Sequence, residues 1–179
     1  MYKHLVFALP LLLTASTAYC QTDVVTPRIL PPTILPAVVK STPRNTSINH
    51  KLDYNNGFRD FHFGQEFHAH ENELKFLFTD GTSNFYERKN ENLKAGYATL
   101  TRIYYVFTNG KLSAIALKLK GQADSDLMKK ALVEQYGNTE ENSYTPGHYE
   151  WKGQQVSLSF NAATLDREEA RVIYMELPQ

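Results

Sequence analysis

The stretch "LTRIYYVFTNGKLSAIALKLKG", residues 100–121, holds two β-rich runs on either side of Asn109-Gly110. Asn-Gly is the preferred pair of a type I′ hairpin turn, because both central residues of that turn need a positive φ. In such a hairpin Phe107 pairs with Leu112. The sequence therefore predicts two antiparallel strands joined by a two-residue turn.

The faces of this hairpin follow from the alternation of side chains along each strand. One predicted face holds Ile103, Tyr105 and Phe107 with Leu112, Ala114 and Ala116, and the other holds Tyr104 and Val106 with Ile115, Leu117 and Leu119. Both faces are largely apolar, which is typical of strands that are not at an edge. We therefore expect the hairpin to lie in the centre of a sheet.

Three further stretches have the features of strands. They are "KFLFTDGTSNFYER" (75–88) with a turn at Asp80-Gly81, "HYEWKGQQVSLSF" (148–160) with a turn at Lys152-Gly153, and "ARVIYMEL" (170–177), where Ile173, Met175 and Leu177 share one face. The last two alternate apolar and polar residues, as half-exposed strands do.

Helical spacing is clearest in "DSDLMKKALVEQYG", residues 124–137. Asp124 and Ser125 are cap-type residues, and Gly137 provides a left-handed stop. The residues at helical spacing between them are Met128, Ala131, Leu132, Gln135 and Tyr136. With a second short helix expected around 66–74, the predicted fold class is α+β. It comprises a single antiparallel sheet of six or seven strands with one main helix packed on one face.

Three of the six histidines, His62, His68 and His70, lie in "HFGQEFHAHENEL", residues 62–74. In a strand, His68 and His70 share a face and could bind a metal ion, with His62 as a third ligand. In a helix, His68 and His70 lie about 200° apart around the axis and cannot share one ion. The two conformations therefore predict opposite chemistry.

The helix is the favoured conformation of this stretch. Gly64 breaks the strand before it, and Phe67 and Leu74 have the i, i+7 spacing of a helical stripe that would anchor on the sheet. We therefore predict no metal ligand and no cofactor here.

The N-terminus has the features of a secretory signal peptide. Lys3 and His4 precede the apolar run 5–13, which is followed by the small residues 14–18. A short positive region, an apolar core of roughly 7–15 residues and a small-residue exit are typical of such signals. We predict a signal peptide over residues 1–20, and a secreted or periplasmic protein with no membrane insertion after its removal.

Cys20 is the only cysteine of the chain. A cysteine just after the apolar core is also the attachment site of bacterial lipoproteins, so a lipid anchor at Cys20 is the alternative. Tyr19 stands where a lipobox has Gly or Ala, which favours free secretion. With no other cysteine, the predicted domain has no disulfide and no thiolate metal site, so its stability must come from a packed core.

Residues 21–49 are predicted to form a proline-rich tether. The segment 23–47 contains Pro27, Pro31, Pro32, Pro36 and Pro43, with no glycine and no aromatic residue. Because proline fixes φ and removes a donor, the segment favours extended polyproline II over a helix. Residues 34–39 have an alternative as an added edge strand. Residues 50–179 are left as one α+β domain, large enough to bury a core.

The charge of this domain does not favour polyanionic partners. Residues 50–179 keep 15 of the 19 basic and 18 of the 19 acidic residues, a net charge of −3. This balance gives no electrostatic reason to expect nucleic acid or an anionic membrane.

Motifs of catalysis do not stand out. The chain has no GxSxG, Walker, GxGxxG, HExxH or EF-hand pattern. Glu150 with another acid across strands would support glycoside hydrolysis only at a separation of roughly 5–9 Å. Near Pro146-Gly147, Tyr144, Tyr149 and Trp151 offer a groove for carbohydrate or peptide, although core packing is favoured for Trp151 and exposure for Tyr144.

Three quoted stretches resemble a group of small exported bacterial proteins with no assigned function. They are "GFRDFHFG", "YERKNENLKAGYATLTRIYYVFTNGKL" and "LVEQYG" followed by a tryptophan strand. The group's pattern is FxFG, YxRxxExLKxGxAxLxxIxYxF with a hairpin, LxxxYG and a W strand, and the likeness covers most of residues 57–160. It implies a fold and export but no activity, and the tether and the His68–His70 pair lie outside it.

Two function classes remain. The favoured one is a non-catalytic secreted or cell-envelope binding module for an unknown peptide, glycan or envelope protein. The alternative is a small metal- or carboxylate-dependent hydrolase. For neither class does the sequence alone assign a catalytic or binding residue.

The signal-like start generates a prediction about the mature protein. We expect a mature N-terminus between Tyr19 and Asp23 and a location outside the cytoplasm, to be checked by the intact mass of protein from the native host. Retained Met1 in a cytoplasmic fraction would contradict export. An added diacyl mass at Cys20 would support the lipoprotein alternative.

Overall fold

The hairpin 100–121 is the centre of the structure, a computed structural model that describes residues 48–178. Its strands are β7 (Arg102–Thr108) and β8 (Lys111–Lys120), and Phe107 pairs with Leu112. Asn109 and Gly110 both have positive φ, 52° and 81°. The predicted turn and its register are therefore confirmed.

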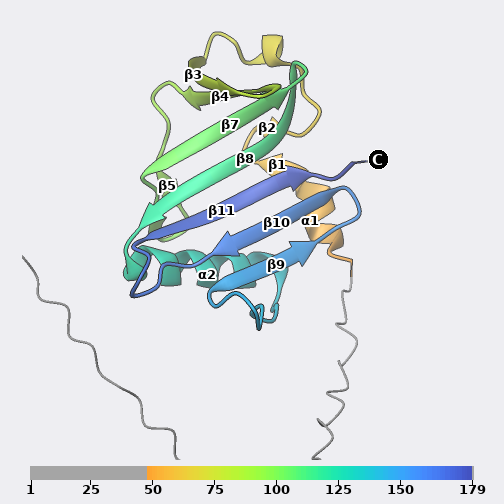
Figure 1. Ribbon diagram of the computed structural model, residues 1–179. Coiled ribbons are helices and arrows are strands. Elements are labelled where there is room, and N and C mark those ends of the chain that lie inside the picture. The colour runs from red at the N-terminus through yellow and green to blue at the C-terminus, as the bar shows by residue number, and fades with distance from the viewer. Residues whose placement is uncertain (1–47, 179) are drawn as a thin grey trace, which may run out of the picture. The chain divides into compact units, whose positions relative to one another are not determined.

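Seven antiparallel strands form the main sheet, in the order β3-β4-β7-β8-β11-β10-β9 (Figure 1). The remaining five strands are β3 (Leu74–Asp80), β4 (Ser83–Arg88), β9 (His148–Lys152), β10 (Val156–Asn161) and β11 (Glu169–Glu176). β8 stands fourth of the seven. The α+β class, the single large antiparallel sheet and the central place of the hairpin are confirmed.

Short elements surround this sheet. They are the helix α1 (His50–Asn55), the 3-10 turn η1 (Phe67–Ala69), and two small hairpins formed by β1 (Gly57–Phe58) with β2 (Phe61–His62) and by β5 (Lys94–Ala95) with β6 (Ala98–Thr99). The helix α1 was not predicted. It begins at an asparagine cap, because the side chain of Asn49 accepts a hydrogen bond from the Leu52 amide.

The main helix, α2 (Gln122–Tyr136), begins earlier than predicted. Asp124 and Ser125 lie in its first turn rather than at its cap, because tertiary contacts use both side chains. Asp124 accepts a hydrogen bond from the Thr99 amide, and the buried Ser125 hydroxyl accepts one from the Ala163 amide. The end of α2 before Gly137, which has a positive φ of 86°, is as predicted.

A bulge in β8 changes the predicted faces of the hairpin. Val106 pairs with Ala114 and Phe107 with Leu112, so Ser113 is an extra residue. The Ser113 hydroxyl bonds the Val106 carbonyl and the Thr108 hydroxyl, which holds the bulge. The residues that share the core face with Leu112 are therefore Ile115, Leu117 and Leu119, not Ala114 and Ala116.

The predicted helix over 66–74 is wrong beyond its first turn. Only Phe67–Ala69 is helical, and Leu74 already belongs to β3. Tertiary hydrogen bonds at both ends of the segment explain this. The Phe67 amide donates to the Gly110 carbonyl, and the Glu73 carbonyl accepts from the Lys89 amide. Both predicted anchors still pack inward, since Leu74 is buried and Phe67 lies against the core.

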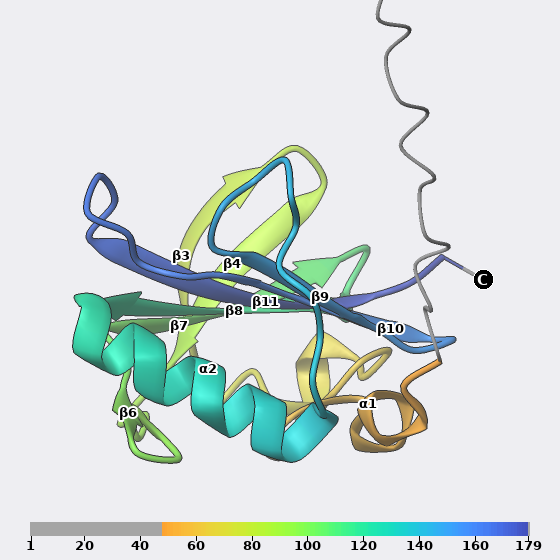
Figure 2. The ribbon, with the colours of Figure 1, turned by 90° about the horizontal axis from the view of Figure 1, so that it is seen from below.

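One face of the sheet carries the core and the other is open. Figure 2 shows α1 and α2 on the same side of the sheet. Buried residues of α2, among them Met128 and Leu132, belong to the same core cluster as the inward side chains of the strands. On β11 the inward residues are Ala170, Val172 and Tyr174, so the predicted Ile173–Met175–Leu177 face is the open one.

The predicted signal peptide, Cys20 and nearly all of the tether lie outside the described residues. Within residues 48–178, no helix is long and apolar enough to cross a membrane.

The two faces generate a stability prediction. Leu117→Ala should lower the free energy of unfolding by about 2–5 kcal/mol, because it leaves a cavity beside α2 in a close-packed core. Met175→Ala on the open face is the matched control and should cost less than about 1 kcal/mol. Urea unfolding of both variants provides the measurement, and equal losses would contradict this assignment of the faces.

Candidate functional site

The three predicted histidines do not come together as ligands of one ion. His68 is exposed and its Nδ1 lies 3.1 Å from Glu71. His70 is nearly buried, with its Nδ1 2.6 Å from Glu73 Oε1. His62 lies elsewhere, with its Nδ1 3.3 Å from the Asn55 carbonyl. Across residues 48–178, no group of three or more His, Cys, Asp or Glu side chains could hold a metal ion.

The other residues singled out in the sequence divide between core and surface. Trp151 and Tyr149 are buried, and the Trp151 indole donates to the Gly137 carbonyl. Tyr144 is 90% exposed, as predicted. The three aromatic side chains therefore do not line one groove. Glu150 contacts His148 and Lys152, each at 3.3 Å, and not a second carboxylate.

A pocket with aromatic walls lies beside α1 instead. It has a volume of about 490 Å³ and is formed by α1, the β1–β2 hairpin, the last turn of α2 and β11. We call it the aromatic pocket. Its lining residues are Tyr54, Asn55, Gly57, Phe58, Arg59, His62, Gln135, Tyr136 and Tyr174. Small-ligand sites are usually concave and combine aromatic walls with a few convergent polar groups, and this hollow has residues of both kinds.

The backbone that shapes this pocket has a positive φ in three places, and Arg59 is the residue type that adopts it least readily. Asn56 and Arg59 have positive φ, 42° and 60°, which non-glycine residues seldom adopt. Gly57 between them has φ 147°, and a side chain there would lie 2.0 Å from the Phe61 carbonyl oxygen. Backbone strain of this kind tends to cluster at binding and catalytic sites.

Polar groups stand among the aromatic walls. The Asn55 side-chain amide donates to the Tyr136 hydroxyl at 3.3 Å. Burial raises the pKa of both Tyr136 and Tyr174, so these phenols stay neutral at physiological pH. Tyr54, by contrast, is 90% exposed at the rim. The pocket thus offers one free aromatic face together with amide, imidazole and guanidinium groups.

Arg59 also lines a second hollow of about 450 Å³, which we call the charged hollow. Its lining residues are Arg59, Glu73, Arg88, Lys89, Asn90, Glu91 and Asn92. Arg59 pairs with Glu91 and donates to the Lys94 carbonyl, and the Tyr105 hydroxyl donates to the same Glu91 at 2.6 Å. A buried phenol of β7 therefore fixes the arginine of the pocket through one carboxylate.

Arg88 is the centre of the charged hollow. Its guanidinium donates two hydrogen bonds to Asp60, at 3.0 and 2.9 Å, and lies 2.6 Å from Glu73. The Arg88 guanidinium also lies over the Phe61 ring, and the Phe61 ring stacks on the His70 imidazole. His70 completes the chain of contacts through Glu73.

Two carboxylates beside Arg88, Asp60 and Glu73, have lowered pKa values. Partial burial raises the pKa of Asp60, but the hydrogen bonds and charge of Arg88 outweigh it and leave the pKa below 3.8. Hydrogen bonds from His70 and then Arg88 hold the pKa of Glu73 below 4.5. The strong donors of the charged hollow are therefore already engaged, and this hollow supports the aromatic pocket more than it offers a site of its own.

Comparison with known proteins gives no match. No family model, no curated protein and no solved structure matches the chain. The resemblance to small exported bacterial proteins therefore stays a prediction.

Sequence patterns missed most residues of the aromatic pocket. Tyr54 and Gln135 lie 81 positions apart, and no local pattern brings them together. The one available signal was Asn56-Gly57, since both residue types adopt positive φ readily. Of the predicted candidates, only His62 lines the pocket.

The charged network generates a prediction about pH. Arg88→Gln should lower the free energy of unfolding at pH 7 by about 1–2 kcal/mol, because two carboxylates lose a charged donor near solvent. Asp60 and Glu73 have lowered pKa values when folded, so their contribution is present above the ordinary values and lost as pH falls. The difference in the free energy of unfolding between the wild type and the variant should therefore shrink as the pH falls from about 5 to about 3.

Urea unfolding of the wild type and the variant at several pH values provides the measurement. Arg171→Gln, which changes an exposed arginine of β11, is the matched control and should leave the pH dependence unchanged. A deficit of Arg88→Gln that stays constant with pH would contradict this account.

Proposed function

We propose that this protein is a non-catalytic exported binding module whose ligand is a saccharide held in the aromatic pocket. The observation that carries the proposal is the pocket's lining, which combines an exposed tyrosine face with amide, imidazole and guanidinium groups. A sugar ring has apolar C–H faces and a rim of hydroxyls, so it needs this combination of flat aromatic surface and hydrogen-bonding groups.

The contacts that hold the residues of the aromatic pocket favour ligand binding over catalysis. Arg59 is held by Glu91 and the Lys94 carbonyl, so a ligand would meet a guanidinium that is fixed in place. Pre-organised groups improve affinity because less freedom is lost on binding. Among the residues that line the pocket there is no Asp or Glu, whereas a glycosidase of the usual kind needs two.

The signal-like start and the proline-rich segment support a location outside the cytoplasm. The proposed binding module is therefore secreted or held in the cell envelope. A saccharide ligand suits that location, because cell walls and surface polymers are rich in sugars.

The proposal generates a binding prediction. Tyr54→Ala should weaken saccharide binding about ten-fold or more, because the ligand loses its stacking surface; ten-fold corresponds to about 1.4 kcal/mol. A glycan array of neutral and N-acetylated oligosaccharides identifies the probe, and calorimetric titration of the best binder measures the effect.

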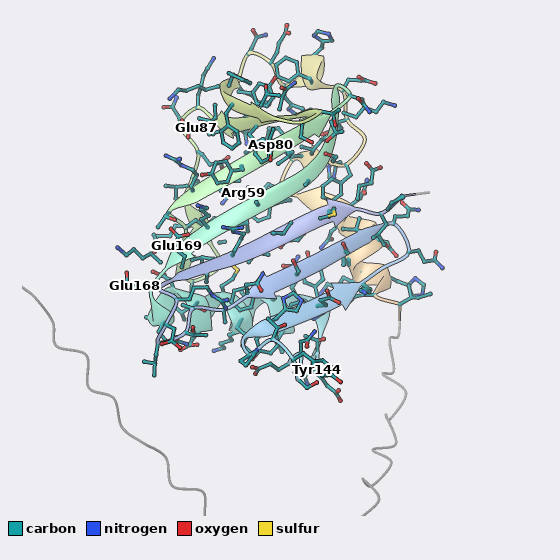
Figure 3. All side chains as sticks on the ribbon, in the orientation of Figure 1. Arg59, Asp80, Glu87, Tyr144, Glu168 and Glu169 are labelled. Carbon is teal, nitrogen blue, oxygen red and sulfur yellow. The ribbon has the colours of Figure 1, made fainter. Side chains whose placement is uncertain are left out.

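Tyr144→Ala is the matched control, since both tyrosines are 90% exposed and Tyr144, in the loop before β9 (Figure 3), does not line the aromatic pocket. Equal effects of the two substitutions, or no binder on the array, would contradict the proposed site. Hydrolysis of the bound saccharide by the wild type would support the hydrolase alternative.

A further inference from the structure

The two edges of the sheet differ in what covers them. At one edge, the carbonyls of β9 accept hydrogen bonds from outside the sheet. His148 accepts from the Asn142 amide, Glu150 from the Thr139 hydroxyl and Lys152 from the Asn49 amide. A covered edge is protected against pairing with another strand.

No described residue covers the other edge of the sheet, which is β3. In residues 48–178, the backbone of residues 75–80 makes no hydrogen bonds except those of the β3–β4 ladder. Phe76 and Phe78 on this strand are 53% and 46% exposed. An edge of this kind presents free N–H and C=O groups beside apolar side chains, which is the requirement for adding a strand.

A bulge makes β3 self-complementary. Phe76 pairs with Tyr86 and Phe78 with Phe85, so Leu77 is an extra residue. Apart from Leu77, residues 75–80 therefore have five alternating positions, with Phe78 in the middle. They are Lys75, Phe76, Phe78, Thr79 and Asp80, of which the first, third and fifth face the open side of the sheet. Without the bulge, Lys75 and Asp80 would lie on opposite faces.

We propose that β3 pairs antiparallel with β3 of a second copy of this chain, which joins two sheets across a two-fold axis at Phe78. Paired residues of antiparallel strands have their side chains on the same face. In this register Lys75 lies opposite Asp80 of the second copy, and Asp80 lies opposite Lys75 of the second copy. The contact is isologous and closed, as in most homodimers.

Aromatic packing reinforces this register. Phe78 stacks on Phe85 with ring centroids 4.5 Å apart and an interplanar angle of 13°. Two Phe78 rings that meet at the axis would extend this stack from one sheet to the other. Phe76 lies opposite Thr79 of the second copy on the other face. The cationic Lys75 and the bulge would discourage unrelated strands, because both are usual protections of an edge.

Charge reversal tests the pairing. Sedimentation velocity of the full chain over a concentration series should show a monomer–dimer equilibrium for the wild type. Asp80→Lys places two lysine pairs across the axis and should weaken dimerisation about ten-fold or more. The double variant Lys75→Asp with Asp80→Lys restores opposite charges and should recover most of the loss.

Asp166→Lys, a charge reversal at an exposed loop residue, is the matched control and should leave the dimer unchanged. Circular dichroism of each variant confirms that the fold is kept. A wild type that stays monomeric at every concentration would overturn the proposal. A dimer that Asp80→Lys does not weaken, or that the double variant does not recover, would overturn this register.

Discussion

The central hairpin and its bulge at Ser113 determine where every layer of the molecule lies. The turn at Asn109-Gly110 fixes the register of β7 and β8, and the extra residue then changes the phase of β8. From Ile115 onward, the large aliphatic side chains face α2 and the small alanines face the open side. Without this phase change, the core face of β8 would carry Ala114, Ala116 and Lys118 after Leu112, and α2 would have little to pack against.

The same hairpin reaches the aromatic pocket through one buried phenol. Tyr105 is fully buried on β7, and its hydroxyl donates to Glu91, which in turn pairs with Arg59. Burial raises the pKa of Tyr105, so this donor keeps its proton. The core of the sheet therefore fixes the position of the Arg59 guanidinium in the aromatic pocket. A loop residue with an unfavourable φ gains the rigidity that a binding site needs.

Local sequence patterns predicted the fold well, because its central turn and the end of its main helix depend on residues that are close together in the sequence. Asn109-Gly110 identified the central turn, and the end of α2 before Gly137 followed from one residue type. The bulge was missed, although the sequence carries its signal, since Leu112 and Ile115 break the alternation that Leu117 continues. The aromatic pocket was not predictable, because it joins segments that meet only through tertiary packing. Nor was the start of α2, where side chains of cap type are used by distant amides instead.

The position of β11 has a consequence for how the chain acquires its structure. β11 is the last strand in sequence, yet it lies between β8 and β10, near the middle of the sheet. Until Glu169–Glu176 is available, β8 has a free side and the β9–β10 hairpin has no sheet to join. Pairing of such distant segments is slow, and it cannot begin before Glu169–Glu176 has been synthesised. Until β11 forms, one side of β8 and the unattached β9–β10 hairpin are therefore free edges that can pair with the wrong strand.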